Sequence, residues 1–138
     1  MKKTYTILAA MALAGSGSAL AVTDITPTPN ATVTPIAVCA GGSAEKFNIA
    51  GGPGTPYTTA DSFIKVGFSV QCSSNTHVAF ANVSGTQFLV GAGSAKGNQS
   101  FMGSSNGGAV VTYTKCTSTN DACSSVDATA ATVAASSM

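Results

Sequence analysis

Four cysteines are the residues in this chain best suited to covalent chemistry, and their spacing favours disulfide bonds. Cys39, Cys72, Cys116 and Cys123 form an even set in which no two are arranged as Cys-x-x-Cys. Structural zinc sites and redox-active thiols usually depend on such a closely spaced pair. The chain also has a single histidine, so too few ligands remain for a metal centre. We therefore expect two disulfides and no metal.

Four cysteines allow three pairings, of which we favour Cys39–Cys72 and Cys116–Cys123. The second pair would close a short polar segment whose Ser, Thr, Asn and Asp residues are typical of a turn. The first pair would tie the beginning of the domain to a strongly patterned strand. Structural disulfides of this kind form in an oxidising compartment.

The remaining polar residues do not form a recognisable catalytic set. Nucleophilic catalysis needs a base beside the nucleophile, and His77, the only histidine, follows a predicted turn and is expected to be solvated. No serine stands in a Gly-x-Ser-x-Gly motif, and the five acidic residues are scattered. The segment from Gly91 to Gly97 lacks the Gly-Lys-Ser/Thr of a phosphate loop and predicts a flexible hairpin loop. We expect neither an enzyme nor a cofactor.

The N-terminus has the three-part layout of a secretory signal peptide. Lys2 and Lys3 precede an uncharged apolar run from Tyr5 to Ala14, and small residues follow as far as Ala21. The run is too short for a membrane anchor, which needs about 20 apolar residues. The pattern predicts a signal peptide over residues 1–21, cleaved after Ala21. We expect export through the periplasm to the cell surface or medium, without stable membrane insertion.

The composition of residues 22–138 excludes several classes of partner. Four lysines stand against five acidic residues and there is no arginine, so the net charge of this part is near −1. Binding to nucleic acid or to an anionic membrane surface needs a basic patch. Charged residues make up 8% of the chain, against about a quarter in typical domains. A surface of Ser, Thr, Asn, Gly and Ala is common both in secreted proteins that pack against copies of themselves and in simple exported domains.

The apolar pattern predicts an all-β domain over residues 39–138. From Ile64 to Cys72 every even position is apolar, which indicates a strand with one buried face. No segment after residue 21 has a convincing apolar stripe at helical spacing, so we expect a sandwich or small barrel. The tail after Cys123 is weakly patterned and predicts at most a last strand. The other predicted strands cover 47–49, 78–83, 87–90 and 109–116, and the stretch 91–108 is rich in Gly, Ser and Asn.

Residues 22–38 form a Thr/Pro-rich N-terminal extension. Pro27, Pro29 and Pro35 exclude a helix and remove main-chain donors. The extension is therefore either an edge or donor strand or a flexible linker.

The order of these features resembles a known family. A signal peptide and an extended lead precede Cys39, a second cysteine closes the alternating strand 68–72, and Val78-Ala79-Phe80, a Gly/Ser-rich stretch and Val110–Tyr113 follow. Over roughly residues 22–116 this resembles the spore coat protein U-like domain, the subunit type of archaic chaperone–usher pili.

The resemblance implies an immunoglobulin-like β-sandwich that lacks one strand. In that family a periplasmic chaperone fills the gap, and donor-strand exchange during assembly at an outer-membrane usher replaces it with the N-terminal extension of the next subunit. The donor would lie within Val22–Val38. Its candidate donor-strand plugs are Ile25, Ala31, Val33 and Ile36.

Three classes of function remain open. The first is a structural subunit of a surface fibre or pilus, in which copies of the chain self-associate by strand addition. The second is a monomeric secreted or periplasmic binding or adhesin-like module, and the third is an enzyme or enzyme inhibitor. An open sheet edge, together with an extension that fits it, would distinguish the first class from the others.

Overall fold

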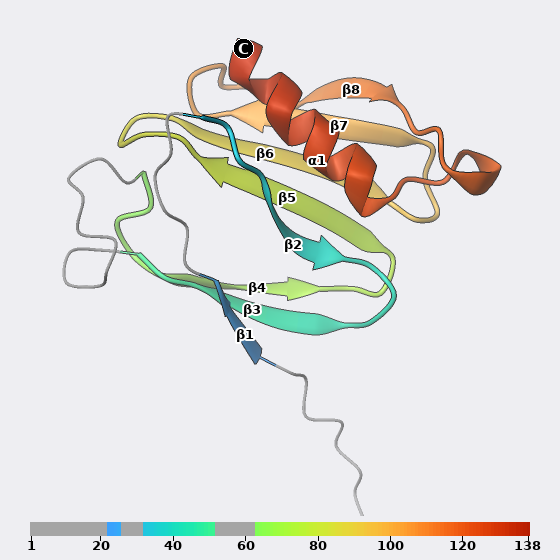
Figure 1. The fold of residues 1–138 in the computed structure, drawn as a ribbon, viewed down its shortest axis with the longest axis horizontal. Coiled ribbons are helices and arrows are strands. Elements are labelled where there is room, and N and C mark those ends of the chain that lie inside the picture. The colour runs from blue at the N-terminus through green and yellow to red at the C-terminus, as the bar shows by residue number, and fades with distance from the viewer. Residues whose placement is uncertain (1–21, 26–31, 52–62) are drawn as a thin grey trace, which may run out of the picture.

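The chain folds into two β-sheets and one C-terminal helix (Figure 1). The structure is a computed structural model and describes residues 22–25, 32–51 and 63–138. The predicted signal peptide, residues 1–21, lies outside the described residues. The β-rich, two-sheet arrangement expected from the sequence is confirmed. The strands are β1 (Val22–Ile25), β2 (Ile36–Ala40), β3 (Glu45–Ile49), β4 (Phe68–Cys72), β5 (Thr76–Asn82), β6 (Phe88–Ser94), β7 (Gln99–Ser104) and β8 (Val111–Lys115).

The two sheets differ in width. The smaller has the strand order β1-β3-β4, and the larger has the order β2-β5-β6-β7-β8. β1 runs parallel to β3, and every other pair is antiparallel. Irregularities interrupt the ladder of β2 with β5 and that of β7 with β8. In the described part of the chain, the edges of the sheets are therefore β1, β4, β2 and β8.

The main apolar core lies between the two sheets. Phe47 and Ile49 of β3 face Val38 of β2 and Phe80 of β5, and all four are almost completely buried. The predicted nine-residue strand ending at Cys72 is shorter than expected. Only its last five residues form β4, because the chain ahead of them bends, which buries Ile64 and leaves Val66 78% exposed.

The C-terminal tail is a helix, so the expectation of an all-β chain with a weak tail and a last strand was wrong. Helix α1 (Ser125–Ala134) continues into a short 3-10 turn, Ala135–Ser137. The main-chain N–H and the hydroxyl of Ser124 donate hydrogen bonds to Asp127 Oδ2 at 2.8 and 2.7 Å. Partial burial works to raise the pKa of the Asp127 carboxyl, but these hydrogen bonds outweigh it and hold the pKa below its usual value. The helix start is thus well capped.

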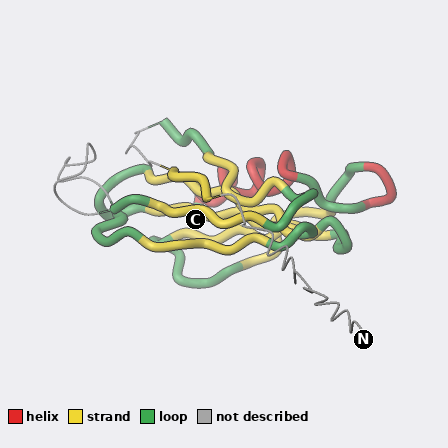
Figure 2. The backbone as a smooth tube through the Cα atoms, turned by 90° about the horizontal axis from the view of Figure 1, so that it is seen from below, coloured by secondary structure: helices red, strands yellow, loops and turns green. Residues whose placement is uncertain are grey.

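Helix α1 packs against the larger sheet through small side chains (Figure 2). Ala128, Ala131 and Thr132 are buried in this contact. The Thr132 hydroxyl lies 3.1 Å from the Ala79 carbonyl oxygen on β5 and 2.9 Å from that of Ala128. Gly91 of β6 lets the helix backbone come close, since a Cβ there would overlap with the Ala128 carbonyl. The larger sheet therefore lies between the helix on one side and the smaller sheet on the other.

Residues 91–94 belong to strand β6, which corrects the expectation of a flexible hairpin loop over 91–97. β6 extends to Ser94, a tight turn over 95–98 follows, and β7 occupies Gln99–Ser104. Gly91 and Gly93 lie on the helix-facing side of β6, where a Cβ at Gly93 would come 2.8 Å from that of Cys123. The glycines here allow close packing.

Replacement of Gly91 by alanine should weaken helix docking. The added methyl group would overlap with Ala128 and lie 2.5 Å from the Thr132 nitrogen, so we expect a loss of about 3 kcal/mol in the free energy of unfolding. Gly97→Ala is the control, because its Cβ would make ordinary contacts of 3.5 Å and 3.6 Å with Ser94. Urea denaturation measures both, and equal stability of the two variants would contradict this account of the packing.

Candidate functional site

An apolar cavity opens between the two sheets. Its volume is about 100 Å³, and four strands, β3 and β4 of the smaller sheet and β5 and β6 of the larger one, supply most of its wall. Every lining residue is apolar, whereas other depressions on the described surface include polar or charged side chains. We call it the β4 groove. Its lining residues are Val38, Ile49, Phe68, Val70, Val78, Phe80, Phe88 and Val90.

The β4 groove borders an open strand edge. β4 has β3 as its only strand neighbour within the described residues, so the main-chain groups on its other side are not used in a ladder. Phe68 of β4 points to the groove and is still 46% exposed. The smaller sheet thus ends before it has covered the inner face of the larger one.

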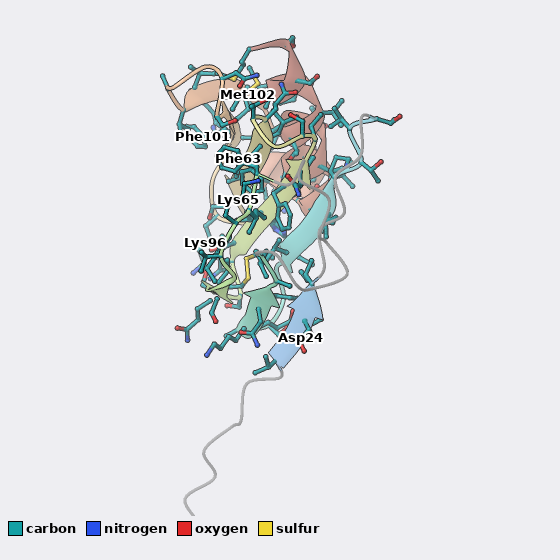
Figure 3. The ribbon with its side chains drawn as sticks, turned by 90° about the vertical axis from the view of Figure 1, so that its left-hand side faces the viewer. Asp24, Phe63, Lys65, Lys96, Phe101 and Met102 are labelled. Atoms are coloured by element: carbon teal, nitrogen blue, oxygen red, sulfur yellow. A yellow bond between two sulfur atoms is a disulfide. The ribbon has the colours of Figure 1, made fainter. Side chains whose placement is uncertain are left out.

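The inner face of the larger sheet continues beyond the groove as an uncovered apolar surface. Phe101 of β7 is aligned with Ala92 of β6, on the same face as Val90, and is 43% exposed. Val110, which precedes β8, lies over Gly103 of β7 and is 76% exposed. Figure 3 shows Phe63, Lys65 and Phe101 on one side of the molecule. One further strand beside β4 would extend the smaller sheet in this direction.

Two phenylalanines that line the groove, Phe80 and Phe88, belong to a stack of three rings. The ring of Phe88 lies 5.3 Å from that of Phe80 and 5.6 Å from that of Phe63, centroid to centroid. The main-chain N–H of Phe63 donates a hydrogen bond to Asn82 Oδ1 at 3.1 Å, and Asn82 is buried. This bond holds the segment that leads into β4 against the end of β5. The groove wall is therefore built by contacts within the domain.

The Cys39–Cys72 disulfide joins the two sheets beside the groove. Cys39 lies on β2 and Cys72 ends β4, with their Cα atoms 5.5 Å apart. Both pairings favoured from the sequence are confirmed. Two structural disulfides indicate an oxidising compartment outside the cytoplasm.

The Cys116–Cys123 disulfide holds the segment before the helix against the sheet. Both residues are buried. Cys116 N–H donates to the Asn98 carbonyl at 2.9 Å, and Cys123 N–H lies 3.1 Å from that of Gly97. The loop between them thus packs on the β6–β7 turn.

The two disulfides should differ in their contribution to stability. Cys39–Cys72 bridges 33 positions and Cys116–Cys123 bridges 7. Loop-closure entropy then predicts losses of about 4 and about 2 kcal/mol when each pair is replaced by alanine. Chemical denaturation of the two double variants measures the difference, and equal losses would mean that chain entropy does not dominate.

The candidate donor-strand plugs occupy different places in the structure. Ile25 of β1 packs against the core between the sheets, and the neighbouring Asp24 accepts a hydrogen bond of 3.1 Å from the Asn48 amide on β3. Ile36 lies on β2 opposite Phe80, and Val33 packs against the core beneath the helix. Ala31 lies outside the described residues. The structure brings Ile25 and Ile36 to one core and Val33 to another.

His77 is buried, which corrects the expectation of a solvated side chain. It is 8% exposed, and its Nδ1 atom has no hydrogen-bond partner among the described residues. Gly41, with φ of +75°, packs on the imidazole, so that a Cβ there would overlap with Cε1 and lie 3.0 Å from Nε2. The ring therefore fills space between β5 and the β2–β3 turn.

Gly41 and Gly42 provide a matched test of this contact. Both have positive φ, and alanine costs about 1–2 kcal/mol in that conformation. Only Gly41 touches His77, since a Cβ at Gly42 would meet nothing within 4 Å. We expect Gly41→Ala to lower the free energy of unfolding by about 2 kcal/mol more than Gly42→Ala. Equal losses in urea denaturation would show that the imidazole does not constrain this turn.

Other chemistry has little support in the described part of the chain. Within it, no three His, Cys, Asp or Glu residues gather as metal ligands. No described helix is both long and apolar enough to span a bilayer. The Gly91–Gly97 segment considered as a phosphate loop belongs to β6 and its turn.

Sequence reasoning did not find the β4 groove. The alternation over 64–72 places Phe68 and Val70 on the inner face of their strand, which is correct. It does not show that the facing sheet is wider, or that Phe88 and Val90 lie at an opening. That difference in width arises from the pairing of β7 and β8, which lie far along the chain.

Comparison of the chain with protein-family models, curated proteins and solved structures finds no match. The function therefore has to be argued from the groove and its surroundings.

Proposed function

We propose that the exported chain is a structural subunit of a surface fibre or pilus and assembles by strand addition. In this proposal, an extended segment of one copy pairs with the open edge of β4 in another and places apolar side chains in the β4 groove. The supporting observation is the juxtaposition of an apolar cavity with an unused strand edge. Each feature alone is common. Together they match an added strand, which supplies both a main chain to pair with and apolar side chains to bury.

An added strand satisfies both features at once. Its main chain pairs with the outer main-chain groups of β4, and every second side chain points between the sheets. The groove wall has no polar side chain, so a polar or charged residue at an inward position would be buried without a partner. The occupant is therefore an extended segment with apolar residues at alternate positions.

The N-terminal extension of a second copy is the proposed occupant. Within one chain, β1 already adds to the smaller sheet at the edge of β3 and inserts Ile25 into the core between the sheets. Ile25, Val33 and Ile36 all pack within their own domain, but Ile25 lies on β1, a four-residue strand at the edge of the smaller sheet, and is therefore the donated residue in this proposal. In this scheme a periplasmic chaperone covers the groove before assembly, and an outer-membrane usher directs the exchange.

Charge substitution at the groove mouth tests this proposal. Phe68→Glu puts a carboxylate at the 46% exposed mouth of the groove, whereas Val66→Glu adds the same charge two residues earlier at a 78% exposed site outside it. We expect the purified mature chain and Val66→Glu to form filaments or ladders by negative stain and size exclusion. Phe68→Glu should form neither filaments nor ladders and should keep an unchanged far-ultraviolet spectrum.

Deletion of the donor provides the complementary test. Removal of residues 22–25 takes away β1 and leaves β2 intact, and should also abolish assembly. A mixture of the deletion variant and Phe68→Glu should form heterodimers, because one retains an acceptor and the other a donor. A sharp monomer peak for the wild-type chain, indifferent to both changes, would instead support the monomeric binding module.

A further inference from the structure

The outer strand of the larger sheet is a second open edge. All five residues of β8 are exposed, and β7 is its only strand neighbour among the described residues. Its sequence, Val111-Thr112-Tyr113-Thr114-Lys115, is rich in the β-branched and aromatic residues that favour strands. It contains neither proline nor glycine. β8 is thus well suited to pair with another strand.

Natural edge strands are usually protected from such pairing by lysine, proline or a bulge. β8 has one bulge, at Tyr113 in its ladder with β7. Its only charged residue, Lys115, is held by Asp121 of the disulfide loop through an Nζ–Oδ2 distance of 2.6 Å. The only lysine of β8 is therefore paired with a carboxylate of its own chain.

The central three residues of β8 are symmetric about Tyr113. Thr112, Tyr113 and Thr114 read the same in both directions, so a two-fold axis at Tyr113 would place each threonine opposite a threonine and the two tyrosines side by side. Cross-strand Thr–Thr and aromatic pairs are favourable in antiparallel sheets. A two-fold contact of this kind uses the same patch on both subunits.

We infer that β8 pairs with β8 of a second copy about a two-fold axis, and joins the two larger sheets into one continuous sheet. This contact lies on a different edge from the β4 groove and does not depend on strand donation there. In a fibre assembled through the groove, it would connect neighbouring fibres side by side.

Sedimentation equilibrium of the mature chain, with both disulfides intact, tests the pairing. The Phe68→Glu background removes groove-mediated assembly, and a dimer should remain. Thr112→Lys places a free charge on the edge and should raise the dimer dissociation constant at least tenfold. Thr86→Lys, in the exposed turn between β5 and β6, is the matched control and should leave that constant unchanged.

Asp121→Asn removes the ion-pair partner of Lys115 and tests the β8 pair independently, from a residue outside the strand. The released lysine should weaken the dimer several-fold, more at low salt than at high salt, because like charges are then brought together. If Asp121→Asn and Thr112→Lys dimerise as tightly as the background chain, or if that chain is monomeric at millimolar concentration, the inference is wrong.

Cross-linking locates the two-fold axis. A cysteine at Tyr113 would face its own copy and should give a covalent dimer under mild oxidation. Val110→Cys is more exposed but lies away from the axis, so it should cross-link poorly. Equal cross-linking of both would contradict the β8 pair.

The two proposals fail separately. If β8 dimers are absent while filaments still form, the inference on β8 is wrong and the proposed function stands; if filaments are absent while β8 dimers form, the reverse holds.

Discussion

The difference in width between two sheets held together by one disulfide determines the surface of this domain. Cys39–Cys72 ties β4 to β2, at one side of the five-stranded sheet. From that point the larger sheet extends through β6, β7 and β8, while the smaller sheet ends at β4. The inner side chains of β6 and β7 therefore have no complete cover. The β4 groove is the place where the core between the sheets reaches solvent.

The opposite face of the larger sheet is covered, because helix α1 packs on it. Helix α1 spans β5, β6 and β7, and its Ala and Thr residues allow it to pack directly on Gly91. Close approach of backbones compensates for the small side chains, since packed atoms supply the dispersion energy that larger residues would provide elsewhere. The chain itself closes this face, so the open inner face is the one to which the proposed partner strand would add.

The sequence predicted the cysteine pairing and the β-rich class because both follow from local patterns. Turn residues between Cys116 and Cys123 limit the pairing, and alternation ending at Cys72 marks a strand. The helix was missed because Ala128, Ala131 and Thr132 give no apolar contrast, so its burial depends on a sheet surface formed by other strands. His77 was missed for a similar reason, since only the fold brings Gly41 onto its ring. The groove depends on the order of strands in each sheet, which residue patterns do not encode.

The small number of charged residues in the chain is consistent with both proposed contacts. Surface charge helps to keep a protein soluble and monomeric, yet charged residues make up only 8% of this chain, and the lysine of β8 is paired with Asp121. Strand addition is favoured where removing water from the surface costs little free energy. This cost is lower for Ser, Thr and small apolar residues than for lysine or glutamate. The two open edges lie on different sheets, so their contacts do not compete. One edge can extend an assembly along a line while the other joins lines together.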